Sequence, residues 1–294
     1  MNRLPPRRPN RIKPTKDLYA KPDCKPEYHK SLAAIEEHGP HLPLLVDWLG
    51  AEELARVIAP CLRRAGWRAV RVPSMPYGAS PLAVGWSGTV SLSIGTLPRV
   101  GGVIRGLARH CFRRFVLTNY QADPGHLRAM ALIKRSAERR GRVQVLFAGF
   151  APGPPKAAMV GPRITALIWS PRPERERHSG ELETAMVLAV RPGLVRRALA
   201  CRLPPAWVDV KRALAGGRTT FRKMNPKGRG YFGWPAAARR DRPRHPHAPR
   251  PVDLPGSPLR APEVAPGVAS PATWRQRPER RKRKVSTTTM PAAG

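Results

Sequence analysis

Three side chains early in the chain combine the residue types from which proteins build metal sites. Glu36 and His38 lie two positions apart, so on an extended segment they point to the same side. Gly39 and Pro40 then turn the chain, and Asp47 follows close enough to return to the same place. Carboxylate oxygens bind hard divalent cations, and zinc also accepts imidazole nitrogen. This spacing therefore predicts a site for a divalent metal ion.

The same stretch, residues 36–43, reads EEHGPHLP and resembles the first motif of the creatininase (creatinine amidohydrolase) family. That motif is Glu-Gln-His-Gly-Pro-His-Leu-Pro followed by an Asp, so Glu37 replaces the usual Gln. The resemblance implies that Glu36 and His38 bind two different metal ions and that Asp47 bridges them. It also implies two divalent ions per subunit, which are zinc, manganese or iron. Without the family, the residues would fit a polar turn before a helix.

A second group of candidate residues lies at 178–184, where the sequence HSGELET precedes or opens a predicted helix. Backbone N–H groups at a helix N-terminus stabilise anions, so carboxylates are favoured here. The segment resembles the family's His-Ala-Gly-Glu-x-Glu-Thr motif. The resemblance implies that His178 assists proton transfer to a leaving nitrogen and that Glu181 lines or completes the metal site. A capped helix start with solvated charges is the structural alternative.

Residues 119–123, with the sequence NYQAD, depart from the family pattern. They follow a predicted buried strand, and the end of such a strand is a usual position for site residues in parallel sheets. The family has a metal-binding His where this chain has Gln121, whose carbonyl would be a weak, neutral ligand. We expect Asp123 to supply the missing charge. Since carboxylates are hard ligands, a site completed by Asp123 would favour manganese or iron over zinc.

His126 has two interpretations in the sequence. It lies near the altered strand end and could replace the missing imidazole as a ligand. It also directly precedes a predicted helix that begins near Leu127, so it could serve as a helix cap.

The predicted substrate-binding residues are Tyr77 and Ser80. They belong to the turn PYGAS at residues 76–80, which is followed by GWSGTVSL at residues 85–92. Together these segments resemble the family's Tyr-Gly-x-Ser turn and the Phe-Pro-Gly-Thr strand that follows it. A surface loop with a hairpin would give the same pattern.

The elements that must position these residues alternate between helix and strand, which predicts an α/β protein. The resemblance covers about residues 31–235 and implies a three-layer α/β/α domain around a mainly parallel sheet, assembled as a homohexamer. The predicted helices cover residues 50–66, 96–112 and 126–140, and the predicted strands cover residues 69–72, 112–119, 143–147 and 164–169.

The two ends of the chain are basic and rich in proline, and we expect both to be disordered. Residues 1–30 carry a net charge of +6, and residues 236–294 carry +9 with 11 prolines and no periodic apolar face. Family members usually enter the first motif from an apolar strand, but here only the last few residues before Glu36 suit a strand. The expected division is therefore a basic segment at 1–30, a creatininase-like domain at 31–235, and a tail at 236–294.

Composition limits the other function classes. The formal charge of +35 on 294 residues would attract nucleic acid without specificity. The four cysteines form no Cys-x-x-Cys pair, which indicates free thiols in a reducing cytoplasm. No stretch approaches the roughly 20 apolar residues of a membrane helix, and the N-terminus has no apolar run typical of a signal peptide.

These observations favour a metal-dependent hydrolase, with two alternatives from other classes. The resemblance implies that a metal-activated water cleaves a C–N bond in a small cyclic amide or formamide. Gln121, the short first strand and Trp234, which replaces a family Asp, instead favour a family member that has lost its metal chemistry and acts as a binding or scaffold protein. A nucleic-acid-associated protein is supported by charge alone. Metal content separates the first two interpretations.

Overall fold

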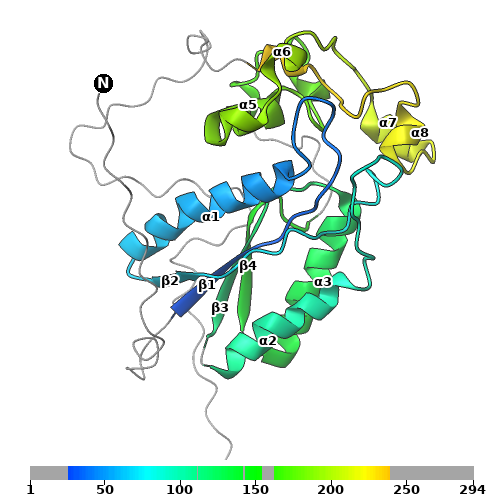
Figure 1. Cartoon of the computed structure of the whole chain (residues 1–294). Helices are drawn as coiled ribbons and strands as arrows, with labels where there is room; N and C mark the ends of the chain where they lie inside the picture. The colour runs from blue at the N-terminus through cyan, green and yellow to red at the C-terminus, as the bar shows by residue number, and fades with distance from the viewer. Residues whose placement is uncertain (1–25, 111, 142, 154–161, 239–294) are drawn as a thin grey trace, which may run out of the picture.

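The computed structural model describes residues 26–110, 112–141, 143–153 and 162–238. A four-stranded sheet runs through these residues in the order β2-β1-β3-β4, and every pair of neighbouring strands is parallel (Figure 1). The prediction of an α/β protein with a parallel sheet is confirmed. The strands are β1 (Pro26–Ser31), β2 (Arg68–Arg71), β3 (Arg114–Asn119) and β4 (Gln144–Gly149).

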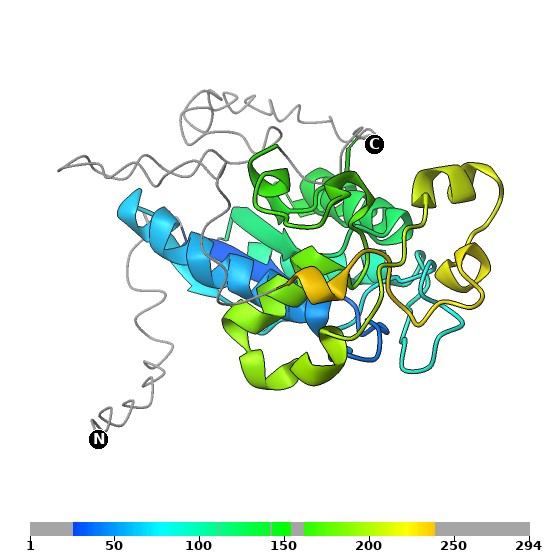
Figure 2. The same ribbon diagram turned by 90° about the horizontal axis from the view of Figure 1, so that it is seen from above.

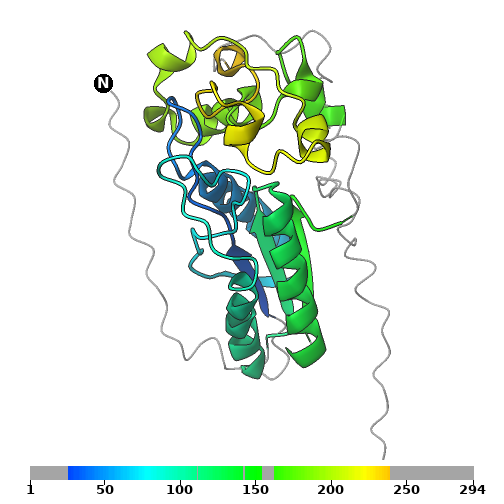
Figure 3. The same ribbon diagram turned by 90° about the vertical axis from the view of Figure 1, so that its right-hand side faces the viewer.

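Helices cover both faces of the sheet and give the three layers expected from the sequence. The helix α1 (Val46–Arg64) packs on one face, where it contacts all four strands. The helices α2 (Gly101–Arg109) and α3 (Pro124–Gly141) pack side by side on the opposite face (Figures 1 and 3). The central strand β3 is therefore covered by helices on both faces, as is usual for a parallel sheet with helical crossovers.

The main hydrophobic core lies between the sheet and the helices α2 and α3. In β3 all residues from Phe115 to Asn119 are buried, because this strand has neighbours on both edges and helices on both faces. Phe115 and Leu117 pack with Ile104 of α2 and Met130 of α3. Each large apolar side chain buried in this way stabilises the fold by about 1.5–3 kcal/mol. The strand ends in the buried polar residue Asn119, so the site residues emerge directly from the core.

The C-terminal part of the described chain folds into short helices above the carboxyl ends of the strands. Figure 2 is seen from this side, and Figure 3 shows these helices together at one end of the molecule. Among them α5 packs against α1. None of the helices in the described ranges combines the length and hydropathy needed to cross a membrane. The remaining elements are η2 (Leu97–Val100), α4 (Pro162–Thr165), η3 (Pro173–Arg175), α5 (Glu181–Val190), η4 (Pro192–Leu194), α6 (Arg197–Ala200), α7 (Val210–Ala215), α8 (Phe221–Met224) and η5 (Pro235–Ala237).

The strand β1 corrects the expectation that all of residues 1–30 are disordered. Its sequence, PEYHKS, is polar and carries no apolar alternation, yet it lies in the middle of the sheet. Backbone hydrogen bonding to both β2 and β3 accounts for this strand, and such tertiary pairing overrides a weak side-chain pattern. The rest of the predicted N-terminal segment, residues 1–25, lies outside the described residues.

Three further differences from the sequence prediction concern the site, a strand and the tail. The helix α1 begins at Val46 rather than residue 50, which brings Asp47 into its first turn. The prediction of a strand at residues 164–169 was wrong, because this stretch begins in the short helix α4 and continues as a turn. The predicted tail at 236–294 begins inside η5, where Ala237 is buried. Its remainder, residues 239–294, lies outside the described part of the chain.

Candidate metal centre

The loop that follows β1 carries two of the predicted ligands into the interior. The N–H of Glu36 donates to the carbonyl of Leu44 at 3.0 Å, which closes the loop. Gly39 turns it with a φ of 72°, a conformation that favours glycine. Nε2 of His41 lies 2.9 Å from the hydroxyl of Thr184, which ties the loop to α5. The first motif is therefore held between the carboxyl end of the sheet and the C-terminal helices.

The imidazole of His38 is fully buried and directed at carboxylates. Its Nδ1 lies 2.9 Å from the carbonyl of Glu36, and because a carbonyl only accepts, Nδ1 carries the proton. The other nitrogen, Nε2, has no hydrogen-bond partner. It lies 3.5 Å from Glu183 Oε2, 3.8 Å from Asp47 Oδ1 and 3.9 Å from Glu36 Oε1. A buried lone pair that faces three carboxylates is the arrangement expected of a metal ligand.

The three carboxylates share a low-dielectric environment that disfavours their charges. Burial, and then neighbouring negative charge, raises the pKa of Glu36 to about 8 and that of Asp47 well above its ordinary value. Burial and the charge of Glu176 raise the pKa of Glu183 to about 7. Within the described ranges no Lys or Arg pairs with these three groups, and Asp47 Oδ2 has no hydrogen-bond partner. A divalent cation would satisfy the carboxylates and the imidazole together, so these residues fit one.

Glu183 is a member of this cluster that the sequence interpretation missed. The backbone N–H of Ser179 donates to Glu183 Oε2 at 2.6 Å and fixes its direction. Ser179 has a φ of 55°, the left-handed conformation that non-glycine residues rarely adopt, and is the one non-glycine residue with positive φ in the described chain. Glu183 is the third residue of α5 and returns to a backbone N–H as in a capping box, although this N–H belongs to Ser179, which precedes the N-cap Gly180. That spacing was the available signal for Glu183.

Glu181 does not belong to the cluster, contrary to the expectation from the sequence. Its Oε1 accepts from the N–H of Trp169 at 2.7 Å, and its Oε2 accepts from the N–H of Ser170 at 2.6 Å. Two residues along an α-helix correspond to roughly 200°, so Glu181 and Glu183 face different sides. Glu181 therefore joins the preceding loop to α5.

Gln121 and Ser80 contact Glu36 as hydrogen-bonding partners. Both side chains are buried. Gln121 Nε2 donates to Glu36 Oε2 at 2.9 Å, to Ser80 Oγ at 2.8 Å and to the carbonyl of Ala79 at 3.1 Å. The hydrogen bond with Ser80 also lowers the pKa of Glu36 against the larger effect of burial. Tyr77, the other predicted substrate-binding residue, is 43% exposed.

Asp123 and His126 lie outside both groups of described residues that could hold a cation. Asp123 Oδ1 accepts from the N–H of Gly125 at 2.7 Å, and its Oδ2 accepts from the N–H of Leu82 at 2.9 Å. The carboxylate therefore holds the start of α3 and an adjacent loop. His126 lies in the first turn of α3, where its Nδ1 accepts from the N–H of Ala79 at 3.3 Å. Neither residue replaces the missing imidazole in this arrangement.

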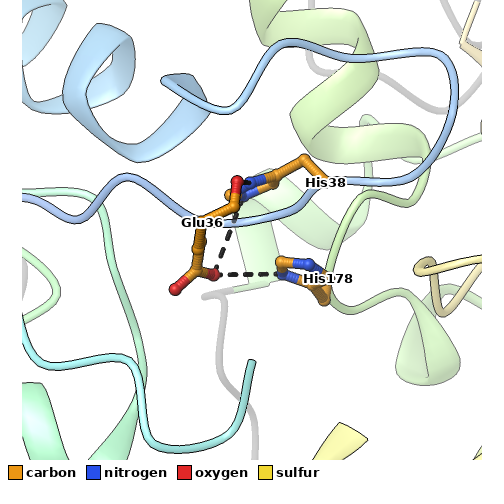
Figure 4. Close-up of side chains that lie close together, drawn as sticks. All are labelled: Glu36, His38 and His178. Carbon is orange, nitrogen blue, oxygen red and sulfur yellow. Dashed lines mark hydrogen bonds and ion pairs between the residues drawn. The ribbon is translucent and has the colours of Figure 1, made fainter. Parts of the chain in front are cut away.

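His178 stands beside Glu36, and Figure 4 shows the two side chains directed at one another. Its Nε2 donates to the carbonyl of Glu37 at 2.6 Å, so the lone pair is on Nδ1, which lies 3.4 Å from Glu36 Oε1. Burial lowers the pKa of His178 to about 4, which keeps it neutral near pH 7. The rings of Phe221 and Trp86 lie 4.8 and 6.0 Å from its ring centre and form an aromatic wall.

The clustered carboxylates predict that the metal-free protein loses stability as the pH rises from 6.5 to 8. Glu36 and Glu183 keep protons in the folded state up to about pH 8 and 7, but release them near 4.5 when unfolded. The unfolded chain then binds fewer protons, so stability falls with rising pH. The lowered pKa values of four buried histidines have the opposite effect, which fades as the pH rises above their ordinary value of 6.5; these residues are His38, His41, His126 and His178. We expect a loss of roughly 2 kcal/mol over this window.

Urea unfolding in the presence of a chelator at several pH values measures this effect. Saturating zinc should abolish the loss, because a bound cation keeps the carboxylates ionised. An equal loss with and without zinc would show that the cation does not bind at these carboxylates.

Comparison with known proteins agrees with the architecture and with the motifs. The family model described as Creatininase: Creatinine amidohydrolase matches residues 31–245. A tryptophan-to-alanine mutant of creatininase is 26% identical, with a TM-score of 0.53, and the match covers 74% of this chain and 83% of that one. A tryptophan-to-phenylalanine mutant of creatininase is 25% identical, with a TM-score of 0.51 and the same coverage of both chains.

A more distant structural match supports the fold alone. It is a candidate creatinine amidohydrolase from Bacteroides fragilis, 20% identical with a TM-score of 0.52, and the match covers 72% of this chain and 80% of that one. No curated protein matches the chain. Because the family model spans most of the sequence, from the end of β1 past η5, this chain belongs to the creatininase (creatinine amidohydrolase) family.

Proposed function

We propose that this protein is a metal-dependent amidohydrolase that cleaves a C–N bond in a small cyclic amide or formamide. The observation that carries the proposal is the unpartnered Nε2 of His38, fully buried and within 3.9 Å of three carboxylates. The neutral imidazole of His178 next to the same carboxylates adds a group that can move protons. Membership of the creatininase family supports the hydrolase class.

The cation-binding part of the site would consist of His38, Asp47 and Glu183. Zinc, manganese and iron all accept this mixture of imidazole and carboxylate ligands. A divalent cation there supplies a Lewis acid that polarises a carbonyl and acidifies water. The chain contributes the orientation, because the hydrogen bonds from His38 Nδ1 and from the Ser179 N–H fix two of the three ligands.

Glu36 and His178 would transfer the protons. Burial raises the pKa of Glu36 above its ordinary value, so its carboxylate, once ionised beside the cation, is a stronger base than an exposed one and can take a proton from water. Its Oε1 lies 3.4 Å from Nδ1 of His178, which carries the lone pair of the ring, so the proton can pass to Nδ1. Burial disfavours a charged imidazole, and His178 therefore gives the proton on to the leaving nitrogen, whose basicity rises as the C–N bond breaks.

The aromatic wall would shape the substrate pocket. Trp86 stacks at 22° to the ring of His178, and Phe221 packs against both rings. Flat apolar surfaces of this kind suit a planar amide or a small ring and keep water away from the proton-transfer groups.

We further propose that the protein acts as a cytoplasmic homohexamer on a small-molecule amide. The hexamer and the substrate class rest on the family resemblance. Cys61 and Cys201 are free thiols, which supports a reducing compartment. The net charge of +35 supports only non-specific attraction to nucleic acid.

The experiment is a hydrolysis assay with the full-length protein loaded separately with zinc, manganese or iron. Creatinine, five- and six-membered cyclic amides and simple formamides are offered, and the released product is measured. We expect turnover of one class that falls by roughly 100-fold or more with a chelator and returns when metal is restored. If less than a tenth of an equivalent of zinc or manganese binds, the protein acts instead as a binding or scaffold member of the family.

A further inference from the structure

Two groups of described residues could hold a cation, and both depend on the same nitrogen. One group is Glu36, His38 and His178, and the other is His38, Asp47 and Glu183. Nδ1 of His38 donates to the Glu36 carbonyl, so Nε2 is the one ring nitrogen of His38 with a lone pair for a cation. One lone pair binds one cation. The two groups therefore surround a single cation position, not two independent ones.

The family resemblance expects a ligand of a second cation at position 121, and the side chain at this position lies against Glu36. Gln121 instead turns its amide nitrogen toward Glu36, Ser80 and the carbonyl of Ala79, at 2.8–3.1 Å. The Ala79 carbonyl can only accept, which fixes the NH₂ group on this side. Amide hydrogens carry partial positive charge, so they occupy Glu36 Oε2 and repel a cation from it.

The neighbouring side chains that could have replaced this ligand are held in place by other contacts and lie outside both groups of described residues that could hold a cation. Both oxygens of Asp123 accept from backbone N–H groups, and both oxygens of Glu181 do the same. Nδ1 of His126 accepts from the Ala79 N–H, so its Nε2, which has no hydrogen-bond partner, carries the proton and offers no lone pair to a cation.

We propose that this chain holds one divalent cation, at His38, Asp47 and Glu183, and that Gln121 takes the place of a second cation by donating to Glu36. This inference rests on the proposed function and departs from the two cations that the family resemblance implies. Gln121 is then a positioning residue. It holds Glu36 Oε2 and leaves Glu36 Oε1 facing His178, so Glu36 and His178 remain available for proton transfer.

The first test is the metal stoichiometry of the full-length wild-type protein. It is equilibrated with excess manganese(II), freed of unbound ion, and examined by elemental analysis and electron paramagnetic resonance. We expect one manganese per chain and the signal of an isolated ion. Two ions per chain with a spin-coupled signal would overturn this inference and leave the proposed function standing. Less than a tenth of an ion per chain would overturn both.

The second test changes Gln121 alone. Gln121→Glu keeps the shape of the side chain but replaces the donor by a carboxylate, and should raise the stoichiometry from one to two with a coupled signal. Gln121→Leu removes the hydrogen bonds without adding a ligand and should stay at one. If folded Gln121→Glu still binds one ion, the role assigned to Gln121 is wrong. If it does not fold, the wild-type stoichiometry still decides the number of cations.

Discussion

Glu183→Gln should lower the occupancy of zinc or manganese at least tenfold, whereas Glu181→Gln should leave it unchanged. Glu183 Oε2 is the carboxylate oxygen nearest to His38 Nε2, at 3.5 Å. The glutamine oxygen can still accept from the Ser179 N–H, so the local fold is kept while the negative ligand is lost. Hydrolysis should fall together with the occupancy.

Glu181→Gln is a matched control, because it is the same substitution on the same helix. In the introduced glutamine the amide oxygen can still accept, but the amide nitrogen cannot. One of the N–H groups of Trp169 and Ser170 therefore loses its partner. We expect a destabilisation of about 1–3 kcal/mol with normal metal content. Elemental analysis and thermal unfolding of both variants separate the two effects. Equal metal loss in the two would contradict the division of roles between these residues.

The first motif was predictable because its geometry is mostly local. Glu36 and His38 lie on one short extended segment, and Asp47 returns within the first turn of the next helix. Their relative positions therefore follow from a few backbone angles and the turn at Gly39. The structure places both carboxylates within 3.9 Å of His38 Nε2, as the spacing had indicated.

The choice between Glu181 and Glu183 could not be made from the sequence pattern alone. The residues that follow, Met186 to Val190, are all apolar, so no single stripe reveals which side of α5 faces the site. The direction is set by packing against α1 and by the left-handed turn at Ser179, both of which are tertiary features.

The strand β1 and the orientation of Gln121 were missed for related reasons. The polar sequence of β1 carries no strand pattern, and its place comes from backbone pairing on both edges. Gln121 was expected to be a weak ligand through its carbonyl. The acceptors around it, among them the Ala79 carbonyl from a distant segment, turn its amide nitrogen toward Glu36 instead. Neither outcome follows from residues that are neighbours in the sequence.

His178→Gln should reduce kcat by about 10²- to 10⁴-fold and leave the metal content unchanged. A glutamine can still donate to the Glu37 carbonyl, but it cannot take a proton from Glu36 and pass it on. KM should change little, because the aromatic wall of Trp86 and Phe221 remains. Single-turnover kinetics and elemental analysis on the same preparation measure the two quantities.

His41→Gln provides the control for removing a buried imidazole. Burial also lowers the pKa of His41 to about 4, but its Nε2 bonds to Thr184 rather than facing the carboxylates. We expect the kcat of His41→Gln to stay within about tenfold of the wild type, since His41 takes no part in proton transfer.

If His178→Gln instead loses the cation, His178 is a ligand within the group of Glu36 and His38, and the proton must reach the leaving nitrogen by another route.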